Sequence, residues 1–91
     1  VHKPSERCPR LGEVLGEVLA PAFPPGVFQT ISGGAGVGAL LAQSEVDVIA
    51  HVGSSAAGAR IARAGALTGA HVIRENGGND PLLVDRDVDP L

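Results

Sequence analysis

Residues 46–52, Val-Asp-Val-Ile-Ala-His-Val, lead directly into residues 53–58, Gly-Ser-Ser-Ala-Ala-Gly, and this segment carries the clearest structural signal in the chain. The near-continuous apolar run predicts a strand that is buried on both faces. Glycine and serine then turn the chain, and Ser54 or Ser55 is well placed to cap a helix. Alanine-rich residues 56–66 predict that helix, so we expect a strand, a tight turn and a helix in succession.

The alternation of strand and helix continues on both sides of this segment. Gly69 is expected to end the helix, and residues 71–74 to form the next strand. Strands that alternate with helices predict right-handed βαβ crossovers, and therefore an α/β fold with a parallel sheet. The other expected elements are a helix over 11–19, a strand over 27–31, a glycine-rich turn over 33–38, a helix over 39–43 and a short strand over 82–84.

Composition narrows the classes of protein. The chain has 91 residues, a net charge of −3, two Phe and no Trp or Tyr, which argues against partners such as nucleic acid or an anionic membrane surface. No apolar run approaches the roughly 20 residues of a membrane span. The single cysteine, Cys8, excludes an intramolecular disulfide and indicates a reducing compartment such as the cytoplasm. The chain begins at Val1 and contains no Met, and we interpret it as a processed or excised piece.

Two glycine-containing segments follow predicted strands, where ligands bind in open parallel sheets. Residues 34–39 fit G-x-G-x-x-A, a pattern whose glycines either let a pyrophosphate approach the backbone or simply make a tight turn. The acidic residue that should follow about twenty positions later is absent. In residues 53–58, the serines are suited either to helix capping or to phosphate binding.

Glu75 is a third candidate, because it ends a predicted strand and is followed by Asn76-Gly77-Gly78. A carboxylate beside two glycines can approach a water molecule and act as a general base, or it can be an ordinary solvated loop residue. The three histidines and Cys8 lack the spacing of zinc ligands, so no metal site is expected. Cys8 is interpreted as a structural or incidental thiol, and His51 as an interior histidine with satisfied hydrogen bonds.

Four segments, taken in order, resemble motifs of the aldehyde dehydrogenase superfamily, and together they span nearly the whole chain. Residues 3–6 match K-P-S-E, and residues 19–27 resemble the "lPxGV" turn with altered spacing. Gly53-Ser54 with Gly58 matches the F-T-G-S-x-x-x-G loop, and residues 75–81 match E-L-G-G-K-S-P. The resemblance implies a Rossmann-like, incomplete cofactor-binding domain.

The resemblance also implies roles for particular residues. Lys3 and Glu6 would contact the adenosine ribose of the cofactor. The loop of Gly53, Ser54 and Gly58 would hold its pyrophosphate. NAD would be favoured over NADP, because the Glu6 carboxylate would repel a 2′-phosphate. Glu75 would be the general base of the catalytic reaction.

By the same resemblance, residues 1–74 form a partial NAD-binding domain, and residues 75–91 begin the catalytic-domain segment. The intact enzyme would be a homo-oligomer that oxidises an aldehyde or semialdehyde to a carboxylic acid through a cysteine thiohemiacetal. The family's nucleophilic cysteine lies downstream of the glutamate and is absent here, and Cys8 is in the wrong place to replace it. The 91 residues alone are therefore expected to be inactive.

Several residues depart from the family pattern. His51 stands where the family has an aromatic residue, and Arg74 and Asn76 replace apolar residues on either side of Glu75. Arg74 is expected to weaken Glu75 as a base through its positive charge. These departures leave two other interpretations open. In the first, the chain is a non-catalytic nucleotide-binding or interaction module. In the second, it folds only when it packs against other segments.

Overall fold

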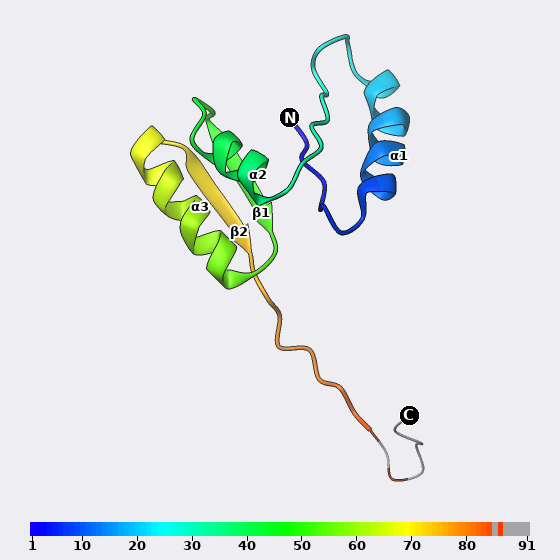
Figure 1. Ribbon diagram of the computed structural model, residues 1–91, viewed down its shortest axis with the longest axis vertical. Coiled ribbons are helices and arrows are strands. Elements are labelled where there is room, and N and C mark those ends of the chain that lie inside the picture. Colours follow the sequence, from blue (N-terminus) through cyan, green and yellow to red (C-terminus); the bar gives the residue numbers. More distant parts are fainter. Residues whose placement is uncertain (85, 87–91) are drawn as a thin grey trace.

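The computed structural model describes residues 1–84 and 86, and it has three α-helices and two strands in this part of the chain (Figure 1). Residues 85 and 87–91 lie outside the described residues. Among them are Asp85, Asp87 and Asp89, for which, together with Arg86, the sequence predicts a solvated charged turn. The elements in chain order are α1 (Pro9–Leu19), the short 3-10 helix η1 (Ala20–Ala22), α2 (Ala35–Ala42), β1 (Val48–Val52), α3 (Ser55–Thr68) and β2 (His71–Glu75).

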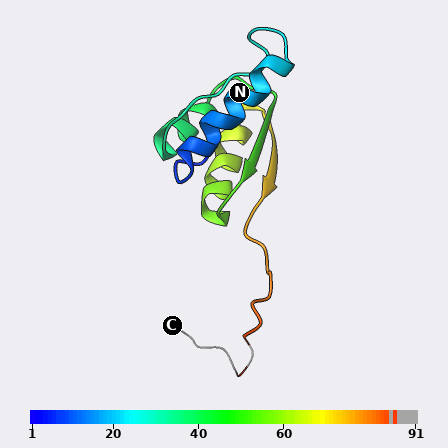
Figure 2. The same cartoon turned by 90° about the vertical axis from the view of Figure 1, so that its right-hand side faces the viewer.

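A βαβ unit forms the centre of the molecule. β1 and β2 pair in parallel, in a register that runs from Val48 opposite His71 to Val52 opposite Glu75. α3 connects the two strands, and α2 and α3 lie on the same face of the sheet (Figures 1 and 2). This arrangement confirms the expected α/β fold with a parallel sheet.

Local sequence explains both ends of α3. The Ser54 hydroxyl oxygen accepts a hydrogen bond from the Ala57 N–H at 3.2 Å, which satisfies one of the N–H groups left free at a helix start. At the other end, Gly69 adopts a left-handed conformation with φ of 81°, which glycine adopts without steric cost. The predicted cap at Ser54 and the predicted end at Gly69 are therefore confirmed.

Two buried glycines let α3 lie close to β2. A Cβ at Gly65 would overlap the side chain of Val72 and would lie 3.4 Å from the Ala70 carbonyl oxygen. A Cβ at Gly58 would overlap the Asn76 side chain, which follows β2. Both glycines are buried, and their positions on one side of α3 fix the distance between the helix and the strand.

The predicted strand over residues 27–31 is wrong in its extent, because only one isolated parallel bridge forms there, between His2 and Thr30. The His2 N–H donates to Gln29 O at 2.7 Å, and the Ile31 N–H donates to His2 O at 2.9 Å. Pro4 has no N–H to continue this ladder. The segment therefore pairs over a single residue instead of forming a strand.

The glycine-rich turn expected over residues 33–38 is mostly helical. α2 begins at Ala35, and Gly34 is its N-cap residue without a side-chain cap. Gly38 lies inside this helix, and the Lys3 side chain packs against it, with Cε 3.5 Å from the position of a Cβ. The glycines thus serve the close packing of a helix, and α2 starts four residues earlier than the predicted helix.

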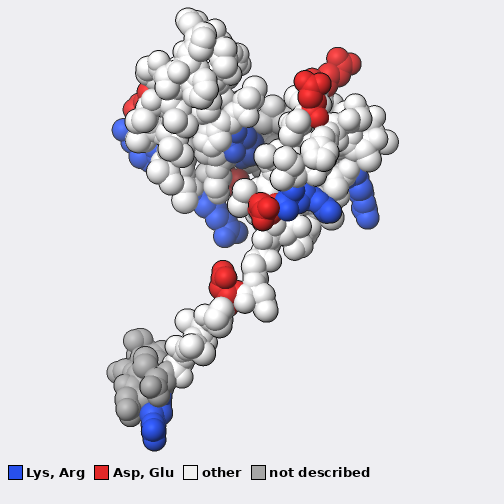
Figure 3. Space-filling view, turned by 180° about the vertical axis from the view of Figure 1, so that it is seen from behind, with Lys and Arg blue, Asp and Glu red and all other residues white. Residues whose placement is uncertain are grey.

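The sheet is covered on one face only within the described residues, which corrects the expected burial of β1 on both faces. Val48 and Val52 are 55% and 84% exposed, and Ile73 of β2 is 46% exposed. Figure 3 views the molecule from this uncovered side, and most of the surface over the sheet is uncharged. Ala42 is the buried hydrophobic residue of the described part, so the core lies between the helices and is very small.

Residues 76–84 extend away from the βαβ unit (Figure 1). They form neither a helix nor a strand, and Leu82 and Leu83 are 89% and 91% exposed. The strand predicted over residues 82–84 is therefore wrong, because no described strand lies beside it to accept its backbone hydrogen bonds. Among the described residues, no helix has both the length and the apolar character needed to cross a membrane.

Candidate functional site at the carboxyl end of β1

A cavity of about 780 Å³ lies where β1 ends, between α2, α3 and the N-terminal segment. This is the edge of a parallel sheet at which ligands bind in open α/β folds. Residues 3–7 form one wall, and the start of α3 and the middle of α2 form others. The cavity lining includes Lys3, Glu6, Arg7, Ala35, Gly38, Ala39, His51, Val52, Gly53, Ser54, Ala57, Arg60, Ile61 and Ala64.

Lys3 is held firmly in the wall of this cavity. Its ammonium group donates hydrogen bonds to Pro4 O at 2.8 Å and to Gly33 O at 2.7 Å. The Glu6 carboxylate lies 3.8 Å from the same nitrogen. The Lys3 side chain is 19% exposed and that of Glu6 is 57% exposed. Glu6 therefore keeps acceptor capacity for a ligand hydroxyl, whereas most of the Lys3 donor capacity is already used within the protein.

The turn after β1 places Gly53 and Ser54 at the N-terminus of α3. The Gly53 N–H donates to Glu75 O at 3.1 Å, which ties the turn to the end of β2. A Cβ at Gly53 would lie 2.9 Å from Cε1 of His51, so the imidazole ring below this turn leaves no room for a side chain. The first N–H groups of α3 have no partner within the helix, and they carry its positive dipole end. This end of the cavity is suited to an anion.

Four of the six predicted site residues line the cavity, namely Lys3, Glu6, Gly53 and Ser54. Gly58 does not line it, and its lack of a side chain makes room for Asn76. Glu75 does not line it either. Side chains alternate along a strand, so Glu75 shares the uncovered face with Val52, its partner in the register.

Arg74 and Glu75 are neighbours in sequence, but their side chains leave β2 on opposite faces. The Arg74 side chain reaches α3, where its Cδ lies 3.4 Å from the Cβ position of Gly58. Neither of the two ion pairs in the described part of the chain joins Arg74 to Glu75. The geometry therefore gives no support to the expectation that Arg74 acts directly on this carboxylate.

Several cavity residues were not predicted. Nε2 of His51 is buried without a hydrogen-bond partner, which contradicts the expectation of a satisfied histidine. Arg60, an exposed residue of α3, was not singled out from the sequence but lines the cavity. The signal for its position is that Ala57, Ile61 and Ala64, three and four residues apart, form one stripe of α3, and this stripe lines the cavity. Arg60 is next to that stripe in sequence.

The G-x-G-x-x-A segment also contributes to the cavity, although it does so from a helix instead of a loop. Ala35, Gly38 and Ala39 line the wall on the α2 side. Cys8 is exposed at the start of α1 and lines neither this cavity nor a smaller one beside α1. The cysteine is therefore not placed to act as a nucleophile at this site.

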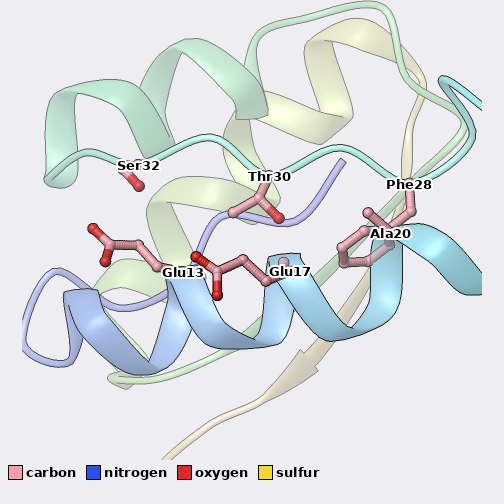
Figure 4. A pocket seen from close by; sticks show the side chains of 7 residues that line it. Glu13, Glu17, Ala20, Phe28, Thr30 and Ser32 are labelled. Atoms are coloured by element: carbon pink, nitrogen blue, oxygen red, sulfur yellow. The ribbon is translucent and has the colours of Figure 1, made fainter.

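A smaller cavity of about 340 Å³ lies between α1 and the segment that follows it. Glu13 and Glu17 project from α1 toward Thr30 and Ser32 (Figure 4). Glu13 is already paired with Arg10 at 3.1 Å. Across the part of the chain that the structure describes, no three His, Cys, Asp or Glu side chains are grouped to hold a metal ion. This cavity contains none of the predicted site residues.

The fold is a Rossmann-like α/β unit with a cavity at the carboxyl end of a parallel strand. The sequence profile of the Aldehyde dehydrogenase family matches residues 1–90. The chain belongs to the aldehyde dehydrogenase family.

Relatives and solved structures agree with this assignment. The chain is 42% identical over 91 residues to a betaine aldehyde dehydrogenase of Cereibacter sphaeroides, covering 98% of this chain and 19% of that protein. It is 44% identical over 95 residues to peroxisomal aminoaldehyde dehydrogenase 2 of Pisum sativum, covering 98% of this chain and 18% of that protein. An aldehyde dehydrogenase structure from Bartonella henselae superimposes with a TM-score of 0.78 at 35% identity, covering 84% of this chain and 17% of that one. The chain thus spans about a fifth of the length of the relatives that it matches.

Proposed function

We propose that the chain forms the nicotinamide-dinucleotide site of an NAD(P)-dependent aldehyde dehydrogenase. Residues 1–74 would be part of the cofactor-binding domain, and residues 75–91 would begin the catalytic-domain segment. The observation that carries the proposal is that Lys3, Glu6, Gly53 and Ser54 line one cavity, although the chain separates the first pair from the second by more than forty residues.

The residues present fit such a cofactor. The Glu6 carboxylate has free acceptor capacity for ribose hydroxyls, and Lys3 fixes the segment that carries it. The start of α3 offers N–H groups and a positive dipole end to the pyrophosphate. His51 adds a buried ring nitrogen without a partner in the same cavity wall. When bound, the cofactor would accept the hydride removed from the substrate.

Glu6 is the residue that we propose to favour NAD over NADP. An added 2′-phosphate would stand next to its carboxylate, and two like charges in contact repel each other. Lys3 offsets this charge only in part, since its ammonium group lies 3.8 Å away and donates to two backbone carbonyls.

Glu75 is proposed as the general base that activates water for release of the carboxylic acid. It lies on the other face of the sheet from α3, but its backbone carbonyl binds the Gly53 N–H. The cofactor turn and the base are thus joined through one hydrogen bond. The only cysteine of the 91 residues is Cys8, so we expect no steady turnover of aldehydes by residues 1–91 alone, measured as NADH absorbance.

The protein that contains this chain is further proposed to be a homo-oligomer in the cytoplasm. The family assignment and the single cysteine of the chain support this proposal. Size-exclusion chromatography with light scattering would measure the oligomeric state, and cell fractionation would locate the protein. A monomer, or a protein recovered outside the cytoplasmic fraction, would contradict the corresponding part.

Nucleotide titration tests the proposed site. In the protein that contains residues 1–91, calorimetry with NAD should show binding. Glu6→Ala should raise the dissociation constant by about tenfold, as expected for loss of hydrogen bonds to a charged group. Lys3→Ala should raise it too, because Lys3 holds the segment that carries Glu6. Arg10→Ala and Glu17→Ala are matched controls, because they remove the same kinds of charge near the smaller cavity. Absence of NAD binding, or equal effects of the control variants, would overturn the proposal.

A further inference from the structure

The main cavity contains a cation that the proposed function does not use. Arg60 of α3 lines the cavity together with Arg7 and Glu6. The two ion pairs of the described residues join Lys3 to Glu6 and Arg10 to Glu13, so neither involves Arg60 or Arg7. The guanidinium groups of both arginines are therefore available to a ligand.

The position of Arg60 along α3 matches a particular part of the proposed cofactor. Arg60 follows the cap residue Ser54 by six positions, which is about 9 Å along a helix axis. The pyrophosphate would lie at the start of α3, so Arg60 stands further along the cavity, where the adenosine ribose would lie. The wall of residues 3–7, which includes Glu6, borders the same cavity.

The balance of charge around this position is positive. Lys3, Arg7 and Arg60 line the cavity and carry one positive charge each, whereas Glu6 is the acidic residue among the lining residues. Lys3 donates to two backbone carbonyls and so has little capacity left. Arg60 keeps its whole donor set, and guanidinium groups bind phosphate through two parallel hydrogen bonds.

We propose that Arg60 binds a phosphate on the cofactor ribose, so that the site accepts NADP as well as NAD. Glu6 sets the preference for NAD, and Arg60 limits that preference, because its charge offsets the repulsion between Glu6 and a 2′-phosphate. Arg7, the second unpaired guanidinium of the cavity, adds to the positive field. This inference rests on the proposed cofactor site.

The test compares the two nucleotides on the protein that contains residues 1–91. Calorimetric dissociation constants for NADP and NAD in the unchanged protein should differ by less than about tenfold. Arg60→Met keeps the aliphatic part of the side chain. It should raise the dissociation constant for NADP, relative to that for NAD, by a further factor of about ten, the usual effect of one charge-assisted hydrogen-bonding group. Arg60→Lys should give an intermediate ratio, since it keeps the charge and loses the planar fork.

Arg63→Met is the matched control. Arg63 is exposed on the same helix and does not line the cavity, so its loss should leave both dissociation constants unchanged. Circular dichroism of each variant checks that α3 is intact. If NAD binds and NADP does not, or if Arg60→Met alters the ratio no more than Arg63→Met does, the role of Arg60 is refuted. If neither nucleotide binds, the cofactor site itself is refuted.

Discussion

The Asn76 side chain occupies the space that a side chain at position 58 would need. This contact explains why Gly58, which the family motif assigns to the cofactor loop, is a glycine. A Cβ at Gly58 would overlap Oδ1 of Asn76. The exposed Asn76 side chain would therefore have to move if a methyl group were added at Gly58. At the residue scale, Gly58 therefore serves the contact between α3 and the segment after β2.

Gly58→Ala should lower the free energy of unfolding by about 1 kcal/mol, because overpacking outweighs the gain in helix propensity. In an Asn76→Ala background the overlap is gone, so the same substitution should stabilise by about 0.5–1 kcal/mol. Gly36→Ala is the control, since nothing lies within 4 Å of its Cβ position. Denaturant unfolding of the protein that contains residues 1–91, compared with its Gly58→Ala, Asn76→Ala and double variants, gives the coupling energy, and equal effects in both backgrounds would contradict the contact.

The proposed role of Glu75 gives a second prediction at the scale of single residues. If it is the general base, Glu75→Gln should lower steady-state turnover by about 100-fold or more in the protein that contains the chain. Rapid mixing should still show a first burst of NADH, because the base acts after hydride transfer. Asp80→Asn, a few residues further along the same segment, is the control and should keep turnover within twofold. Loss of the burst together with turnover would contradict this role.

At the scale of elements, the sequence was most informative where capping residues and periodicity agreed. Ser54, the alanine-rich helix and Gly69 specified α3 almost to the residue. The segments that were predicted wrongly depend on partners that local sequence does not show. Residues 27–31 have strand propensity, but Pro4 stops their ladder after one bridge. In residues 33–38, glycines that are typical of a turn lie in a helix, where Gly38 makes room for the Lys3 side chain.

The cap of α3 gives a prediction at this scale. Ser54→Ala removes the acceptor for the Ala57 N–H and should destabilise the first turn by about 1 kcal/mol. Hydrogen exchange of the Ala57 and Gly58 amides, which bond to Ser54, should then be about five times faster. Ser55→Ala is the control, because the cap hydrogen bond comes from the Ser54 side chain and alanine favours helix. Similar exchange rates in the two variants would show that the cap is energetically unimportant.

At the scale of the whole molecule, the sequence predicted which residues lie together better than it predicted which residues are buried. Four of six predicted residues share a cavity because motif order and the α/β topology bring strand ends together. Strand alternation places Glu75 on the uncovered face, and helix periodicity places Arg60 beside the cavity. Both placements could have been predicted from the sequence, but neither was. The burial of β1 was overestimated. Its apolar residues indicate that both faces of the strand should be covered, but they do not show which segment covers each face. Val52 at 84% exposed is the clearest case.

The uncovered sheet determines how residues 1–91 should behave alone. Ala42 is the buried hydrophobic residue of the described part, and the sheet has two strands. Two-stranded sheets with little apolar burial are marginal in water. We therefore expect a gradual loss of ellipticity in urea and binding of the dye ANS, which reports exposed apolar surface. Val52→Thr with Ile73→Thr should reduce ANS binding without changing the urea profile, because both side chains face solvent. A sharp cooperative transition would show that the helices alone supply enough stability.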